Sequence, residues 1–95
     1  MVGVIIVDSV RIDRYSVGSV VISKAGRDVG TYYVVVDRAG RFLYLAGPKH
    51  GMRRLKRKNI KHVQPTKMRL ARLLAWEVED VVRKLNEEGK VHRRG

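Results

Sequence analysis

The chain lacks several features that mark whole classes of protein. It has no cysteine, which excludes disulfides, thiolate metal sites and thiol catalysis. No apolar run approaches the roughly 20 residues of a membrane span. The apolar run at residues 2–7 meets Asp8 before it reaches the roughly 7 to 15 residues of a signal-peptide core. With 95 residues the chain can form one domain, because domains typically need about 100 to 150 residues. We therefore expect a small cytoplasmic domain.

Acidic residues are missing from one long segment of the chain. None of the nine Asp and Glu residues lies between Arg38 and Trp76, although that segment carries twelve of the 21 Lys and Arg residues. The other nine bases balance the nine acids, so this segment holds the whole formal net charge of +12. Charge concentrated in this way is typical of a protein that binds a polyanion, most often a nucleic acid. The alternative is a solvated basic surface that has no partner.

Short runs of β-branched and aromatic residues, separated by glycine, predict a sheet of short strands. The expected strands are residues 18–23, 31–36, 41–46, 52–55 and 60–64. Strands this short can bury their apolar side only if the sheet closes into a small barrel. The adjacent Tyr32 and Tyr33 must face opposite sides of their strand, and Phe42 is expected in the core. Residues 1–14 form a separate extension that could add an edge strand.

The C-terminal part has the periodicity of an amphipathic helix. Pro65 ends the strand region and Thr66 can cap a helix. The apolar residues that follow recur at three- and four-residue steps: Met68, Ala71, Leu74, Ala75, Val78, Val81, Val82 and Leu85. Gly89 is the predicted stop, and residues 90–95 are expected to be a flexible tail. The predicted fold is therefore mainly β with a C-terminal helix: a five-stranded barrel over residues 15–66 and a helix over residues 67–89 that packs on it.

Two segments carry a resemblance to a known family. Residues 18–37 resemble a KOW motif, in which a strand, a glycine-containing loop and a second strand follow one another, with Gly26 and Gly30 as the motif glycines. Residues 53–66 resemble the bacterial KOW-domain RNA-binding proteins related to the archaeal and eukaryotic large-subunit ribosomal protein fourteen-e. The resemblance covers residues 17–66, about half of the chain. It implies an SH3-like barrel that binds ribosomal or other structured RNA.

Bases in the first loop, in the acid-free segment and in the first predicted helical turns are the candidate RNA contacts. They are Lys24, Arg27, Lys49, Arg53, Arg54, Lys56, Arg57, Lys58, Lys61, Lys67 and Arg69. Such bases position a protein on phosphates without reading sequence, so recognition of RNA shape is expected. Gly26 would let a phosphate approach the backbone closely. Asp28 would repel a phosphate, and we interpret it as a residue that caps the loop or orients Arg27.

Catalysis and metal binding have little support in the sequence. The three histidines are not spaced as metal ligands, and no nucleotide-binding glycine loop is present. The acids near the C-terminus are expected to form surface pairs, Glu79 with Arg83 and Asp80 with Lys84. We therefore expect no enzyme, cofactor, small-molecule substrate or membrane contact. The leading hypothesis is a cytoplasmic protein that binds RNA, possibly within or beside the large ribosomal subunit. The alternative is an SH3-like module that binds an acidic protein or pairs with another chain through its C-terminal helix.

Overall fold

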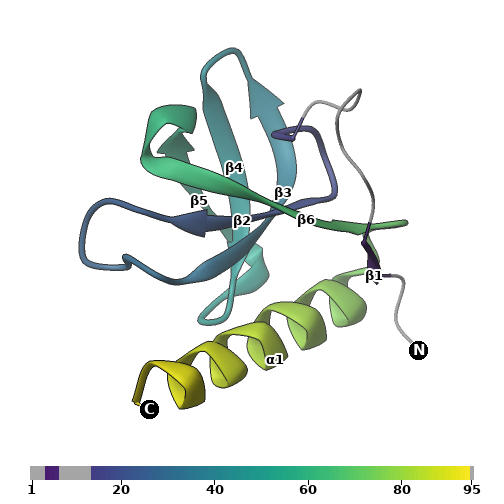
Figure 1. The fold of residues 1–95 in the computed structure, drawn as a ribbon. Coiled ribbons are helices and arrows are strands. Elements are labelled where there is room, and N and C mark those ends of the chain that lie inside the picture. The colour runs from purple at the N-terminus through teal and green to yellow at the C-terminus, as the bar shows by residue number, and fades with distance from the viewer. Residues whose placement is uncertain (1–3, 7–13, 95) are drawn as a thin grey trace.

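The computed structural model describes residues 4–6 and 14–94, and shows a curled antiparallel sheet with one helix across it (Figure 1). The fold is therefore mainly β with one C-terminal helix, as predicted. The elements are β1 (Val4–Ile6), β2 (Ser19–Ser23), β3 (Tyr32–Ala39), β4 (Phe42–Gly47), β5 (Gly51–Asn59), the 3₁₀ turn η1 (Ile60–His62), β6 (Val63–Leu70) and α1 (Ala75–Arg94).

The strands lie in the order β1-β6-β2-β3-β4-β5, and every neighbouring pair is antiparallel. Because β2 pairs with both β3 and β6, the first and last long strands are neighbours and the sheet is barrel-like. The hydrogen-bonded ladder is nevertheless open, since among the described residues nothing pairs β5 with β6 or β1. The chain passes from β5 to β6 through η1 instead. The expectation of a fully closed barrel is therefore wrong in this respect.

Both faces of the central strands are buried, which explains their nearly continuous apolar sequence. One face packs against the helix through Val20, Val34, Ala46, Leu70, Val78, Val81 and Val82. The other face fills the inside of the curl with Val21, Tyr33, Val35, Leu43, Leu45 and Val63. Tyr32 packs against the first cluster and Tyr33 belongs to the second, so these neighbours face opposite sides, as predicted.

The helix begins later than predicted. Residues 63–70 form β6, and α1 starts at Ala75. Pro65 lies within β6 opposite Val21 and does not end the strand region. Thr66 does not cap a helix, because its hydroxyl donates to the carbonyl of Val20 at 2.7 Å and so joins β6 to β2. Met68 and Leu70 are two positions apart and pack against the same core cluster, which is the spacing of a strand.

The ends of the helix also differ from the prediction. Its first turn contains Glu77, which lies near the positive end of the helix dipole, and the bases expected there belong to β6 or to the turn before the helix. The helical backbone continues through Gly89 to Arg94, so Gly89 is not its stop and residues 90–94 are not an irregular tail. A glycine inside a helix costs only about 1 kcal/mol.

The possibility of an N-terminal edge strand is confirmed for three residues. Val4–Ile6 form β1, which pairs with the end of β6 in the register Val4 with Leu70 and Ile6 with Met68. The rest of the predicted extension, residues 1–3 and 7–13, lies outside the described residues. Strand β1 thus extends the sheet at the edge opposite β5.

Candidate nucleic-acid interface

Most of the bases that the sequence singled out lie on β5 and on the loops next to it. They come from the β2–β3 loop, the turn between β4 and β5, β5 itself and η1, and all of them except Lys58 are exposed. We call the following eight residues the basic surface: Lys24, Arg27, Lys49, Arg53, Arg54, Lys56, Arg57 and Lys61. The β2–β3 loop is tied to η1, because the amide of Lys24 donates to the carbonyl of His62 at 2.9 Å.

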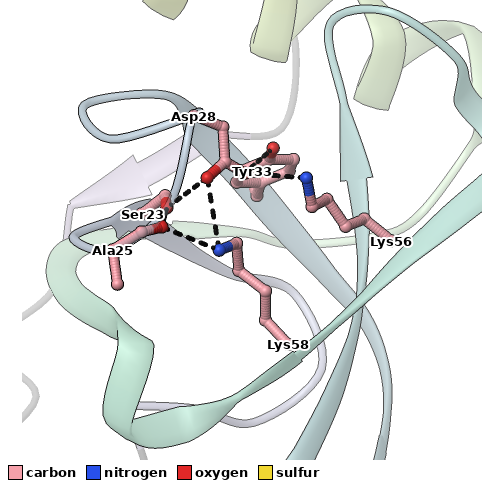
Figure 2. Close-up of polar contacts among 6 residues, drawn as sticks. All are labelled: Ser23, Ala25, Asp28, Tyr33, Lys56 and Lys58. Atoms are coloured by element: carbon pink, nitrogen blue, oxygen red, sulfur yellow. Dashed lines mark hydrogen bonds and ion pairs between the residues drawn. The ribbon is translucent and has the colours of Figure 1, made fainter.

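Asp28 joins the β2–β3 loop to β5 through a polar network (Figure 2). Its Oδ1 accepts a hydrogen bond from the Ser23 hydroxyl at 2.8 Å and lies 3.2 Å from Nζ of Lys58. Its Oδ2 accepts a hydrogen bond from the Tyr33 hydroxyl and lies 3.2 Å from Nζ of Lys56. The Lys58 ammonium also donates to the carbonyl of Ala25 at 3.0 Å. The carboxylate is therefore satisfied by two hydroxyls and two ammonium groups.

The strand register explains why two lysines reach this carboxylate. Lys58 lies directly across from Leu43, and Lys56 across from Leu45, in the β4–β5 pair. Directly opposed residues project to the same side of a sheet. Both leucines point into the inside of the curl, so both lysines start toward that apolar side as well. Asp28 supplies the negative charge that allows them to remain there.

The protonation states in this network follow from its contacts. Burial alone would raise the pKa of Asp28, but the hydrogen bonds from Tyr33 and Ser23 and the contacts with Lys56 and Lys58 outweigh it and hold that pKa well below its usual range. Burial and the negative charge of Asp28 raise the pKa of the Tyr33 hydroxyl above its ordinary value. The carboxylate is therefore charged and the phenol protonated across the physiological range.

These contacts correct the interpretation of Asp28 and sort the candidate bases. The carboxylate holds Lys56 and Lys58, and does not serve to orient Arg27. Only 12% of the Lys58 side chain is exposed, so this residue is part of the fold, whereas 51% of the Lys56 side chain is exposed. Arg69 also has a partner within the fold, because its Nη1 donates a hydrogen bond to the hydroxyl of Ser16 at 2.5 Å.

Two of the predicted bases lie elsewhere in the fold. Lys67 and Arg69 belong to the half of β6 that pairs with β1 and with the start of β2. Lys67 is exposed there, and Arg69 is half-buried. Neither residue was predicted to lie on a strand, because their placement depended on the helix that was expected to begin at residue 67. They are not part of the basic surface.

The motif glycines shape the loop that carries Asp28. Gly26 has φ of +90° and Gly30 has φ of +89°, a conformation that side chains disfavour. The amide of Gly30 donates to the carbonyl of Ser23 at 2.8 Å, which closes the loop at the end of β2. Gly30 therefore turns the chain from the loop toward β3. A Cβ atom on Gly26 would lie 3.6 Å from Oδ1 of Asp28, so the loop backbone runs directly beside the network.

An aromatic side chain lies on the outer side of the β4–β5 pair. Phe42 is 37% exposed, so the expectation that it belongs to the core is wrong. It precedes Leu43, which points inward, so the alternation of the strand turns Phe42 outward. The guanidinium carbon of Arg57 lies 4.6 Å from the centre of its ring, which is cation–π distance. This contact holds Arg57 at the edge of the basic surface.

Glu77 and Asp80 of the helix make ion pairs of their own, whereas Glu79 lines a small hollow together with Lys49 and Arg53 of the basic surface. Arg72 makes two contacts with the buried Glu77, at 2.9 and 2.8 Å, and they hold the pKa of that carboxyl below its usual range. Asp80 pairs with Lys84 at 3.2 Å, as predicted, and also with Arg83 at 2.6 Å. The side chain of Glu79 lies against Gly51 at the start of β5, which the sequence did not indicate.

A pocket opens within the basic surface. Its volume is about 410 Å³, and it lies between the β2–β3 loop and the turn that joins β4 to β5. Lys49, His50 and Arg54 contribute to its lining together with Lys56 and Asp28. The sequence did not indicate this pocket, because its wall is formed by segments up to about 30 residues apart.

Three wider properties of the chain bear on its function. Residues 4–6 and 14–94 contain no group of three or more His, Asp or Glu side chains that could hold a metal ion. In the same part of the chain, no helix is both long enough and apolar enough to cross a membrane. No protein-family model matches the chain.

Proposed function

We propose that this protein binds structured RNA through its basic surface, as the resemblance to KOW-domain proteins implies. The observation that carries the proposal is the distribution of charge around β5. The β2–β3 loop, the β4–β5 turn, β5 and η1 contain eight exposed bases and one acid, Asp28. Because Asp28 is occupied by Lys56 and Lys58, it offers little repulsion to a phosphate that approaches the remaining bases.

The chemistry of these bases favours backbone contacts over sequence reading. Arg53, Arg54 and Arg57 can each form paired hydrogen bonds with phosphate oxygens, and the lysines act as point charges. The basic surface includes two loops and one edge strand, so its shape follows the curl of the sheet. A surface of this kind fits the backbone of folded RNA. The family resemblance makes RNA of the large ribosomal subunit the first candidate partner.

The test is a salt titration with fragments of large-subunit ribosomal RNA, followed by fluorescence anisotropy. If four to six of the bases neutralise phosphates, the logarithm of the affinity should fall with the logarithm of salt concentration with a slope of about −3 to −5. The double variant Arg53→Ala/Arg54→Ala should reduce the magnitude of that slope by about 1.4 to 1.8. An affinity that does not change with salt would contradict the proposal.

A matched control has the same loss of charge elsewhere. Lys67 lies on β6 and Lys84 on α1, and both are exposed. The variant Lys67→Ala/Lys84→Ala should change the salt slope far less than Arg53→Ala/Arg54→Ala. If both double variants weaken binding equally, the effect is one of net charge and the basic surface is not the binding site.

The alternative partner, an acidic protein, would use the same charges, so the experiment must separate the two. In a density gradient of cell lysate, the RNA-binding hypothesis expects the protein to sediment with the large ribosomal subunit and to be released by nuclease. A complex that survives nuclease would favour a protein partner. Pairing through the helix has less support, because its apolar residues Val78, Val81 and Val82 already pack on the sheet.

A further inference from the structure

The pocket within the basic surface has more room than a phosphate contact needs. Its volume of about 410 Å³ lies in the range of about 300 to 1,000 Å³ that is usual for small-molecule sites. Thr31 lines it from the end of the β2–β3 loop, Tyr33 from β3, Gly47 from the last position of β4 and Pro48 from the turn that follows. A ligand that fills the pocket must therefore be larger than a phosphate group alone.

Gly47 contributes to the shape of the pocket because it has no side chain. A Cβ atom at this position would lie 2.6 Å from Cε1 of Tyr33. The Tyr33 ring is therefore packed against the Gly47 backbone, and its hydroxyl is held by Asp28. These contacts fix the inner wall of the pocket.

The charges around the pocket favour an anion. Lys49, Arg54 and Lys56 contribute three positive charges and Asp28 one negative charge, so the Lys, Arg and Asp side chains of the lining carry a formal net charge of +2. Asp28 is a poor acceptor for a ligand, because both of its oxygens already accept from the protein. Lys49, His50 and Arg54 are exposed and remain as donors at the rim.

We propose that this pocket receives one unpaired nucleotide of the bound RNA, with the base in the hollow beside Thr31 and Pro48 and the phosphate at Lys49 and Arg54. This inference rests on the proposed function and names the feature of the RNA that is recognised. Nucleotides in bulges and loops are already unstacked, so they enter a pocket at low cost. The pocket would thus select irregular RNA over a regular helix, which the basic surface alone does not do.

The test compares two RNA hairpins that differ by one bulged nucleotide. The wild-type protein should bind the bulged hairpin roughly tenfold more tightly than the fully paired one, which corresponds to about 1.4 kcal/mol of additional contact with the base. If both hairpins bind equally well, the pocket inference is overturned while RNA binding stands. If neither hairpin nor any ribosomal RNA fragment binds, the proposed function itself fails.

A variant that fills the pocket without changing charge gives the sharper comparison. Thr31→Phe should abolish the preference for the bulge and leave the affinity for the paired hairpin unchanged. Val29→Phe is the matched control, because it adds the same ring to the same loop at an exposed position outside the pocket lining. Thermal melting followed by circular dichroism checks that both variants fold. A bulge preference that survives in a folded Thr31→Phe variant would overturn the inference.

A second pair of variants covers the case in which Thr31→Phe does not fold. Arg54 lines the pocket, whereas Arg57 lies on the same strand over Phe42. Arg54→Gln should reduce the preference for the bulge several-fold, and Arg57→Gln should weaken both hairpins equally. Equal effects of the two variants on the preference would contradict the inference.

Free 5′-AMP is the last probe in the experiment, because a mononucleotide has the same base, sugar and phosphate groups as the bulged nucleotide of the RNA. It should compete only weakly with the bulged hairpin, and Thr31→Phe should remove that competition. If free 5′-AMP binds more tightly than the bulged hairpin, the pocket serves a free nucleotide and its assignment to RNA is wrong.

Discussion

Replacing Asp28 by asparagine tests the network that ties the β2–β3 loop to β5. Asp28→Asn keeps the size of the side chain and removes its charge. In the wild-type protein, the two carboxylate oxygens contact two hydroxyls and two ammonium groups. The asparagine side chain offers these four groups a single carbonyl oxygen as acceptor. Lys58, with only 12% of its side chain exposed, loses its negative partner. Its ammonium would still have the Ala25 carbonyl, but no counter-charge.

The size of the effect follows from these contacts. A hydrogen bond to a charged group contributes about 1.5 to 3 kcal/mol, and removing one partner of a buried ion pair costs about 3 to 5 kcal/mol. The Asp28 side chain is 15% exposed and Lys56 is half exposed, so solvent weakens the pairs. We therefore expect the free energy of unfolding to fall by about 2 to 3 kcal/mol. For a domain of this size, that lowers Tm by roughly 8 to 24 °C.

The assay is thermal and urea denaturation at pH 7, followed by circular dichroism. Asp37→Asn is the matched control, because this exposed carboxylate accepts a hydrogen bond of 2.8 Å from the amide of Arg38 and touches no part of the Asp28 network. Its loss should cost less than about 0.5 kcal/mol, as is usual for surface substitutions. If Asp28→Asn is no more destabilising than Asp37→Asn, the network does not stabilise the fold as we have argued.

The same network predicts how stability depends on pH. The folded-state pKa of Asp28 is held below its unfolded value of about 4. Its contribution is therefore fully present above about pH 4, and it is lost as the pH falls from there toward the lowered folded-state pKa. The wild-type protein should lose more stability than Asp28→Asn between pH 4 and pH 2, measured by urea midpoints. Parallel curves for the two proteins over that interval would contradict the pKa assignment.

Two glycine positions give further predictions about packing. Gly47→Ala places a Cβ atom 2.6 Å from the Tyr33 ring, so it should lower the free energy of unfolding by about 1 to 3 kcal/mol in urea denaturation. A loss below about 0.5 kcal/mol would show that the ring can move away freely. Gly51→Ala should also destabilise the fold, because φ is +59° there and the new Cβ atom meets the Glu79 side chain. Adding Glu79→Ala should recover only part of that loss, since the positive φ remains, and full recovery in the same assay would argue against backbone strain.

The strand pattern could be predicted from the sequence because it depends on short-range alternation. The runs that became β2, β3 and β4 are β-branched and are separated by glycines, and the structure has strands within one or two residues of the predicted bounds at most of their ends. The opposite orientation of Tyr32 and Tyr33 followed from the period of a strand alone. The concentration of bases in one segment was equally visible, since it needs only the order of residues.

The start of the helix could not be predicted in the same way. Residues 66–70 fit a helix through their spacing with later apolar residues, and they fit a strand through the alternation of Met68 and Leu70. The second pattern holds in the structure because β6 gains hydrogen bonds with both β2 and β1. The Thr66 hydroxyl adds a bond to the Val20 carbonyl. Partners that lie more than 40 residues away in the chain outweighed the local helical preference.

By itself, the sequence determined that this is a small β-rich domain with a helix after the strands and a segment of unbalanced positive charge, because composition and local periodicity specify these properties. Only the tertiary structure decided which bases remain exposed. In the structure, Lys58 is buried against Asp28, Arg53 and Arg54 lie at the surface, and Lys67 lies on β6, away from the basic surface. The physical reason is that the environment of a charge depends on the segments that fold against it, and those segments are distant in the chain.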